Sequence, residues 1–104
     1  MPKYRATTRA FVEPQRGHSL LALNGDEFEA ASDVTPGFTW EPLDDEARRL
    51  KALSIPDPHR SPIGHKQLFA LAKSLGASGD LHVDDAKNFV AAWRAAELQT
   101  DEVT

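Results

Sequence analysis

Apolar and polar residues alternate along the first thirty positions, which is the pattern of β-strands. The segment 4–12, YRATTRAFV, predicts one strand with Tyr4, Ala6, Thr8 and Ala10 on one face and Arg5, Thr7, Arg9 and Phe11 on the other. Pro14 and Gly17 then indicate a turn. The segment 18–24, HSLLALN, predicts a second strand, so the N-terminal third favours a small β unit.

The dipeptide Asn24-Gly25 interrupts this pattern. Both residues tolerate the positive φ that a tight type I′ hairpin turn requires. The following DEFEAA alternates again, with Phe28 predicted inward and Glu27 and Glu29 outward. The interpretation is a hairpin with a returning strand at 26–31. An alternative is a helical turn over 20–23 that Asn24 caps.

The middle of the chain predicts a loop and then a helix. Pro36-Gly37 marks a turn, and we expect Phe38 and Trp40 beside it to lie over the end or face of the β unit. Pro42 suits the first turn of a helix, where its missing N–H is not needed. The charge order supports this helix, with acids at 44–46 and bases at 48, 49 and 51. Its predicted apolar stripe is Leu43, Ala47, Leu50 and Leu53.

The second half predicts a linker and a helical hairpin. Prolines at 56, 58 and 62 indicate an extended linker. The next helix would bury Leu68, Leu71, Ala72 and Leu75 and end at Gly76, and the last would bury Ala86, Phe89, Val90, Trp93 and Ala96. Phe69, Leu71, Phe89 and Trp93 would supply most of this core, and residues 99–104 would form a polar tail. The predicted fold is α+β, with an N-terminal β-hairpin or SH3-like unit and middle helix (1–54), a Pro-rich linker (55–63) and a helical hairpin (64–104).

Composition narrows the function classes. The 104 residues are 40% hydrophobic and 27% charged, which is typical of a folded globular chain. The absence of Cys excludes disulfides, thiol nucleophiles and Cys-based zinc sites. No stretch is long and apolar enough for a membrane span or a secretory signal, so we expect a soluble intracellular protein without membrane partners.

Catalytic constellations are not predicted. The histidines, at 18, 59, 65 and 82, lack the i, i+4 spacing of a helical zinc site, and a metal protein built around His59, His65 and His82 remains a minor alternative. The acids at 44–46 are better explained by the helix dipole than by a glycosidase pair, which needs carboxylates facing each other across a cleft. We therefore expect no enzyme activity, no cofactor and no bound metal.

Two small basic sets leave nucleic-acid binding open. One is Lys3, Arg5 and Arg9, and the other is His59, Arg60, His65 and Lys66, with Arg60 and Lys66 as candidate phosphate contacts. The net charge of −4 argues against a protein that coats nucleic acid. The two tryptophans each allow a core or an interface role, with the core favoured for Trp93 and the two roles balanced for Trp40.

Three stretches carry a resemblance: YRATTRAFV, NGDEFEA and PGFTWEPLDDEARRLKA. Together, over roughly 4–52, they resemble small proteins encoded among the head and neck genes of tailed phages and prophages. The resemblance implies a virion or assembly component, namely a capsid decoration protein, a head–tail joining protein or an assembly accessory, and it transfers no catalytic residues. The second half is similar to short helix–loop–helix modules that bind partner proteins or DNA ends.

The leading hypothesis is a non-enzymatic structural or assembly protein of a tailed phage. It would bind capsid or neck proteins, or copies of itself, in the virion and in the host cytoplasm during assembly. Phe11, Phe38 and Trp40 would be its partner-binding residues, since exposed apolar groups mark contact sites. The alternative is a nucleic-acid-associated regulator that uses the C-terminal helical hairpin.

Overall fold

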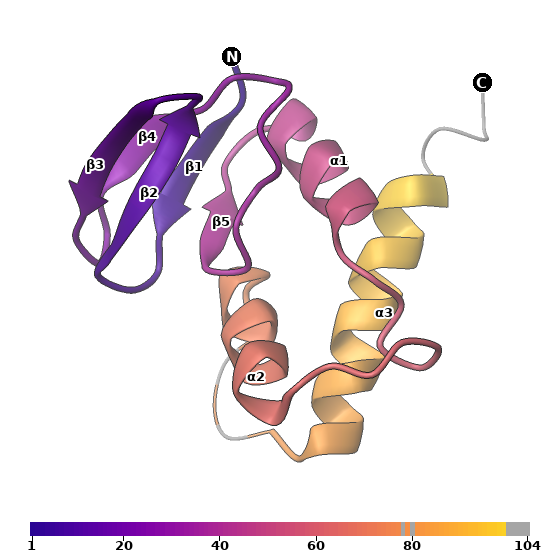
Figure 1. Ribbon diagram of the computed structural model, residues 1–104. Coiled ribbons are helices and arrows are strands. Elements are labelled where there is room, and N and C mark those ends of the chain that lie inside the picture. Colours follow the sequence, from indigo (N-terminus) through magenta and orange to yellow (C-terminus); the bar gives the residue numbers. More distant parts are fainter. Residues whose placement is uncertain (78, 80, 100–104) are drawn as a thin grey trace.

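The chain has an α+β fold. The computed structural model describes residues 1–77, 79 and 81–99. Within them, five short strands in two sheets precede three helices (Figure 1). The predicted fold class is confirmed, while the SH3-like topology, the extended linker and the three-part domain division stay predictions. Residues 100–104 of the expected polar tail lie outside the described residues.

The first sheet is built on a short central strand. β1 (Lys3–Ala6) pairs antiparallel with β4 (Glu27–Glu29) on one side and with β5 (Trp40–Pro42) on the other. The guanidinium of Arg5 lies 3.2 Å from a Glu27 oxygen and 2.9 Å from a Glu41 oxygen. Both glutamates stand directly opposite Arg5 in the register, so opposite charges support the pairing of all three strands.

The single strand predicted over 4–12 is wrong. The chain leaves the first sheet after Ala6 and starts β2 (Ala10–Gln15), which forms a separate hairpin with β3 (His18–Ala22). The break has a tertiary cause, because the backbone N–H and the hydroxyl of Thr7 both donate to the carbonyl of the distant Thr39. These bonds tie Thr7 to the loop before β5, and the chain turns there.

The turn at Asn24-Gly25 is confirmed, but its predicted type and partner strands are wrong. The Asp26 N–H donates to the Leu23 carbonyl at 2.9 Å, and Gly25 has a φ of 96°. No described non-glycine residue has a positive φ, so Asn24 does not meet the type I′ requirement. The returning strand β4 pairs with β1 and not with β3. The helical alternative for 20–23 is also wrong, because β3 runs through Ala22.

The β unit has its own core between the two sheets. It consists of Tyr4, Ala6, Val12, Ala22, Ala30, Trp40 and Ala47, with Phe28 and Val34 packed against it. Phe28 therefore lies inward as predicted, and Trp40 takes the core role of its two interpretations. The three rings lie in mutual contact, with the Trp40 ring 5.3 Å from that of Tyr4 and 4.9 Å from that of Phe28.

Replacing Tyr4 with Phe is expected to stabilise the protein. The Tyr4 hydroxyl is buried and has no hydrogen-bond partner among the described residues, and burial raises the pKa of this phenol to about 12. An unpartnered buried hydroxyl costs about 1–3 kcal/mol, so Tyr4→Phe should raise the free energy of unfolding by about 1 kcal/mol. Urea denaturation at pH 7 measures this change, and a loss of stability would contradict the expectation.

The middle helix begins later and turns a different face inward than predicted. α1 runs over Asp45–Ser54, and Asp44 caps it by accepting the Ala47 N–H. Pro42 therefore ends β5 and does not lie in the first helical turn. The predicted stripe is wrong in part. Ala47 is buried as predicted, but Leu53 is exposed, and the other buried residues of the helix are Lys51 and Ala52.

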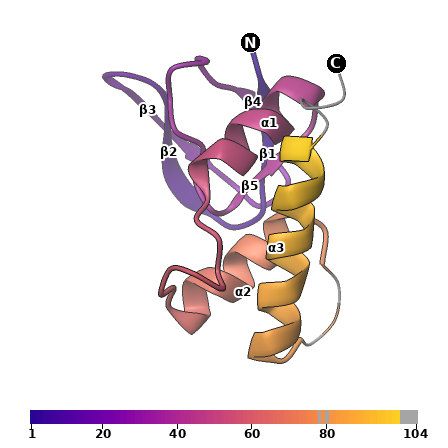
Figure 2. The ribbon, with the colours of Figure 1, turned by 90° about the vertical axis from the view of Figure 1, so that its right-hand side faces the viewer.

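The C-terminal helices are close to the prediction. α2 (His65–Ser74) ends in a Schellman motif, where Gly76 has a φ of 100° and the N–H of Ala77 donates to the Ala72 carbonyl. α3 (Val83–Gln99) lies beside both α1 and α2 (Figure 2). The second core consists of Ile55, Leu68, Leu71, Ala72, Ala86 and Val90, with Phe89 and Trp93 packed against it. Phe69 is exposed instead, so its predicted share in this core is wrong.

Candidate protein-contact surface

Several large exposed apolar side chains of the β unit gather on and directly after the β2–β3 hairpin. Phe11 is 78% exposed, and its cross-strand partner Leu21 is 41% exposed. Leu23 follows two residues after Leu21 and is 49% exposed. We call Phe11, Leu21 and Leu23 the hairpin face. A phenyl ring exposed to this degree next to leucines is a feature of binding surfaces, because solvent contact with it is unfavourable.

Strand alternation explains why these side chains face solvent. Val12 and Ala22 are buried in the core of the β unit, and successive side chains of a strand point to opposite sides. Phe11 and Leu21 precede them by one position and therefore point outward. The sequence placed Phe11 on the face opposite Ala10, but it gave no signal that this face lacks a covering element.

The other two predicted partner-binding residues have different surroundings. Trp40 is 7% exposed, so its ring offers a partner almost no surface. Phe38 is half-buried and packs against the second core, although it precedes the helices in sequence. The structure thus separates the three predicted residues and leaves Phe11 as the exposed one.

A buried lysine, which the sequence pattern did not predict to lie inside, joins the two cores. Lys51 Nζ is fully buried and donates to the Phe38 carbonyl at 3.1 Å, to the Trp40 carbonyl and to Ser74 Oγ at 2.6 Å. The Ser74 hydroxyl donates in turn to the Leu71 carbonyl. The ammonium therefore connects α1, the start of β5 and the end of α2. The available signal was its spacing, since Lys51 stands four residues from both Ala47 and Ile55.

The electrostatics of Lys51 are those of a structural group. Burial lowers the pKa of its amine to about 7, while the nearby Glu41 carboxylate acts in the opposite direction. A protonated amine has three hydrogens, which match the three acceptors. Lys51 is completely enclosed by the surrounding residues.

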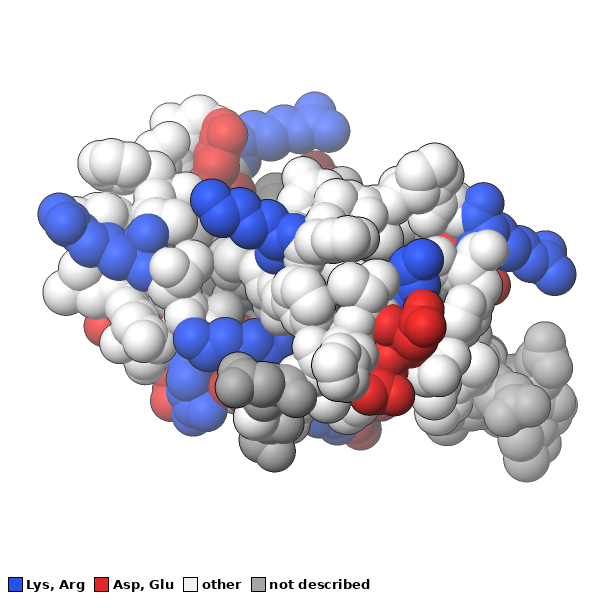
Figure 3. Space-filling view, turned by 90° about the horizontal axis from the view of Figure 1, so that it is seen from below, with Lys and Arg blue, Asp and Glu red and all other residues white. Residues whose placement is uncertain are grey.

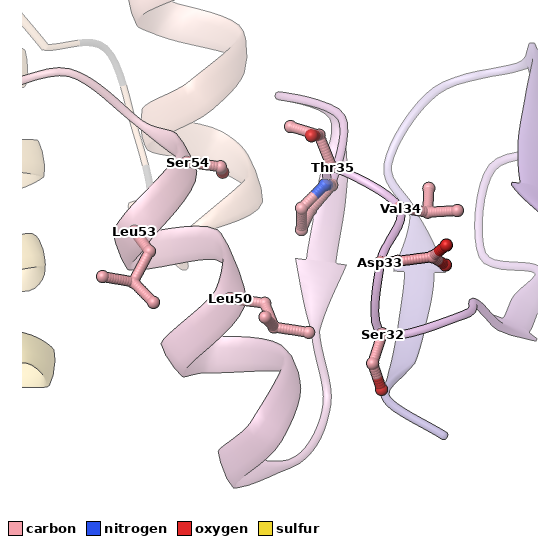
Figure 4. A pocket seen from close by; sticks show the side chains of 8 residues that line it. Ser32, Asp33, Val34, Thr35, Leu50, Leu53 and Ser54 are labelled. Atoms are coloured by element: carbon pink, nitrogen blue, oxygen red, sulfur yellow. The ribbon is translucent and has the colours of Figure 1, made fainter.

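Two shallow hollows lie on either side of the loop 32–36. One, of about 220 Å³, lies between this loop and α1 and is lined by Ser32, Asp33, Val34, Thr35, Pro36, Leu50, Leu53 and Ser54. Figure 4 shows Leu50 pointing toward the loop, whereas Asp33 and Val34 point away from the helix. The other hollow, of about 250 Å³, lies on the opposite side of the loop and is lined by Glu13, Arg16, Asp33, Val34 and Thr35. The first hollow brings no pair of carboxylates together for acid–base chemistry.

The two candidate phosphate contacts, Arg60 and Lys66, are both exposed but lie in different elements. Arg60 lies in the turn at 58–60 with Asp57 at 3.9 Å, and Lys66 lies in the first turn of α2. Seen from below in Figure 3, Lys and Arg side chains are spread over the face with other residues between them. This distribution differs from the continuous basic track that backbone binding of nucleic acid requires.

Clusters of metal ligands and membrane-spanning helices are absent from the described part of the chain. Among the described residues, no three His, Asp or Glu side chains lie close enough to hold a metal ion. No helix in the described part of the chain is long and apolar enough to cross a membrane. Comparison of the chain with family models, with curated proteins and with solved structures gave no match.

Proposed function

We propose that this chain is a non-enzymatic structural or assembly protein of a tailed phage or prophage virion. It acts through protein–protein contacts that the hairpin face makes with capsid or neck proteins. The observation that carries the proposal is the exposure of Phe11 and Leu21 side by side on the hairpin face, which no other element in the described part of the chain covers. The resemblance of residues 4–52 to phage head and neck proteins supplies the class of partner.

The placement of the hairpin on one side and of the helices on the other agrees with a role in joining two proteins. The β2–β3 hairpin projects from the side of the β unit, away from α2 and α3 (Figure 1). Lys51 of α1 donates to the Trp40 carbonyl of the β unit and to Ser74 of α2. Arg94 of α3 donates from Nε to the Ile55 carbonyl at the end of α1, at 3.1 Å. A docked hairpin would therefore present the helical part to a neighbouring subunit. The protein would reside in the virion and, during assembly, in the host cytoplasm.

Phe11→Asp is expected to abolish binding to virion proteins. The substitution places a charge at the centre of the hairpin face, and burying an unpaired carboxylate in an interface is unfavourable. Because Phe11 is 78% exposed, the fold should be unaffected. The measurement is co-sedimentation of the purified protein with phage heads and pull-down with purified phage capsid and neck proteins.

Leu53→Asp is the matched control. Leu53 is 58% exposed on α1, so the variant adds the same charge at an apolar surface position outside the hairpin face. We expect it to bind like the wild type. Equal binding by wild type and Phe11→Asp, or no binding of the wild type to any head or neck protein, would contradict the proposal.

A further inference from the structure

The outer edge of the β2–β3 hairpin is open. β3 pairs only with β2 in the described part of the chain, and its residues His18, Ser19, Leu20 and Leu21 are all exposed. Figures 1 and 2 show β3 at the periphery of the molecule. Its outward N–H and C=O groups form a template for a further strand.

This edge also lacks the features that prevent edge pairing. Proteins protect exposed strands with charged side chains, prolines or bulges. β3 has no Lys, Arg, Asp, Glu or Pro. The register irregularity of the hairpin lies in β2, where three steps from Val12 to Gln15 oppose two steps from Leu20 to His18. The outer edge of β3 is therefore regular over its five residues.

We infer that β3 pairs antiparallel with the β3 of a second copy of this chain, across a two-fold axis centred at Leu20. In this register Leu20 faces the partner's Leu20, Ser19 faces the partner's Leu21, and His18 faces the partner's Ala22. The register uses all five residues of the strand and brings no two acidic or two basic side chains of β3 opposite each other. A symmetric pairing of this kind uses the same surface on both subunits and closes as a dimer.

The pairing would enlarge the smaller of the two sheets. A two-stranded hairpin is marginally stable in water, whereas three or more strands with an apolar face are more stable. The dimer would contain a four-stranded sheet in the order β2-β3-β3-β2. It would also bring two hairpin faces together as one larger apolar surface. The inference thus deepens the proposed function and rests on it for the role of that surface, which stays available to virion proteins.

Cysteine cross-linking tests the register, because the chain has no Cys of its own. Facing residues of an antiparallel pair have Cα atoms about 4.5–5.5 Å apart, which is within disulfide range. Leu20→Cys should therefore form a disulfide-linked dimer under mild oxidation. Ser19→Cys or Leu21→Cys alone should link poorly, since identical residues there are diagonal and about 7–8 Å apart. A mixture of the two variants should restore the link.

Solution mass across a concentration series tests the dimer without any link. The wild type should show a dimer by light scattering, and Leu20→Lys, which sets two like charges opposite each other, should weaken the dimer fivefold or more. Leu20→Val is the matched control and should still dimerise. Circular dichroism checks that each variant is folded. A wild type that is monomeric throughout, or a dimer in which Leu20→Cys links no faster than Leu53→Cys, would overturn the inference.

The two proposals fail separately. A monomer that still binds head or neck proteins through Phe11 leaves the proposed function and removes the β3 pairing. A dimer that forms the predicted cross-links but binds no virion protein would support the β3 pairing and contradict the proposed function.

Discussion

The free energy of unfolding is expected to rise by roughly 3 kcal/mol between pH 7 and pH 9.5, and Lys51 is the reason. Burial lowers the pKa of this amine from 10.5 to about 7 in the folded protein. Between these two values the unfolded chain binds a proton that the folded protein has released. Stability therefore increases with pH in this window, at about 1.4 kcal/mol per unit where the difference is one full proton. Below pH 7 both states are protonated, and the dependence from this group ends.

The pH range in which stability increases has an upper limit, which Tyr4 sets. Burial raises the pKa of its phenol from 10.0 to about 12, so the folded protein keeps a proton that the unfolded chain loses. This group makes stability fall as the pH rises above 10. The two opposed slopes cancel between about pH 10 and pH 10.5, so the two residues together predict a maximum of stability there. Measurements between pH 7 and pH 9.5 report on Lys51 with little contribution from Tyr4.

Lys51→Met is the variant that tests this assignment. Methionine fills a similar volume without a titratable group, so the slope between pH 7 and pH 9.5 should disappear. Its stability at pH 7 combines two opposed terms, because it avoids burying an amine but leaves the Phe38 and Trp40 carbonyls without this donor. The slope is therefore the informative quantity. Lys73→Met, on the exposed side of α2, is the control and should keep the slope of stability against pH. A wild type whose urea-unfolding free energy is flat over this range would contradict the burial of the amine.

The sequence predicted well those elements whose signals are local. The acid-to-base order of residues 44–51 located the middle helix, and Gly76 located the end of α2 because a Schellman motif favours glycine there. The Asn24-Gly25 turn was also visible. These features depend on a few neighbouring residues, so no tertiary information is needed to find them.

The failures share a tertiary cause. The strand at 4–12 is divided because Thr7 bonds to the distant Thr39, and no local signal announces that contact. The stripe of α1 was misplaced because Lys51 takes a core position. Lysine is rarely fully buried, and only the carbonyls of Phe38 and Trp40 together with Ser74 make its burial feasible. The acceptors come from two segments, one before α1 and one at the end of α2, so the local sequence around Lys51 could not bring them together.

The sequence predicted only part of the candidate surface. Phe11 and Trp40 were predicted alike as partner-binding aromatics, yet one is 78% exposed and the other 7%. Alternation assigns a side chain to a face of a strand but does not say which face another element covers. The covering of Trp40 depends on the two sheets packing against each other, which only the fold determines.

Trp40→Ala is accordingly expected to destabilise the protein by about 3–5 kcal/mol, the range for removing a large aromatic from a core. The ring packs edge-on against Tyr4 and Phe28, and Gly37 accommodates it closely. A Cβ at Gly37 would lie only 2.8 Å from the indole nitrogen. For a domain whose total stability is typically about 5–15 kcal/mol, this loss leaves a large unfolded fraction on warming. Thermal and urea unfolding measure it, with Trp40→Phe expected to lose less.

Phe11→Ala is the matched comparison for Trp40→Ala. Because its side chain is already in solvent, the substitution should change stability by less than about 0.5 kcal/mol. The two aromatics then differ in kind, since Trp40 acts on folding and Phe11 on binding. If Trp40→Ala were as stable as Phe11→Ala but lost its partner, Trp40 would be a contact residue and the packing of the two sheets described above would be wrong. A stability loss confined to Trp40→Ala, with binding loss confined to Phe11 variants, is the expected result.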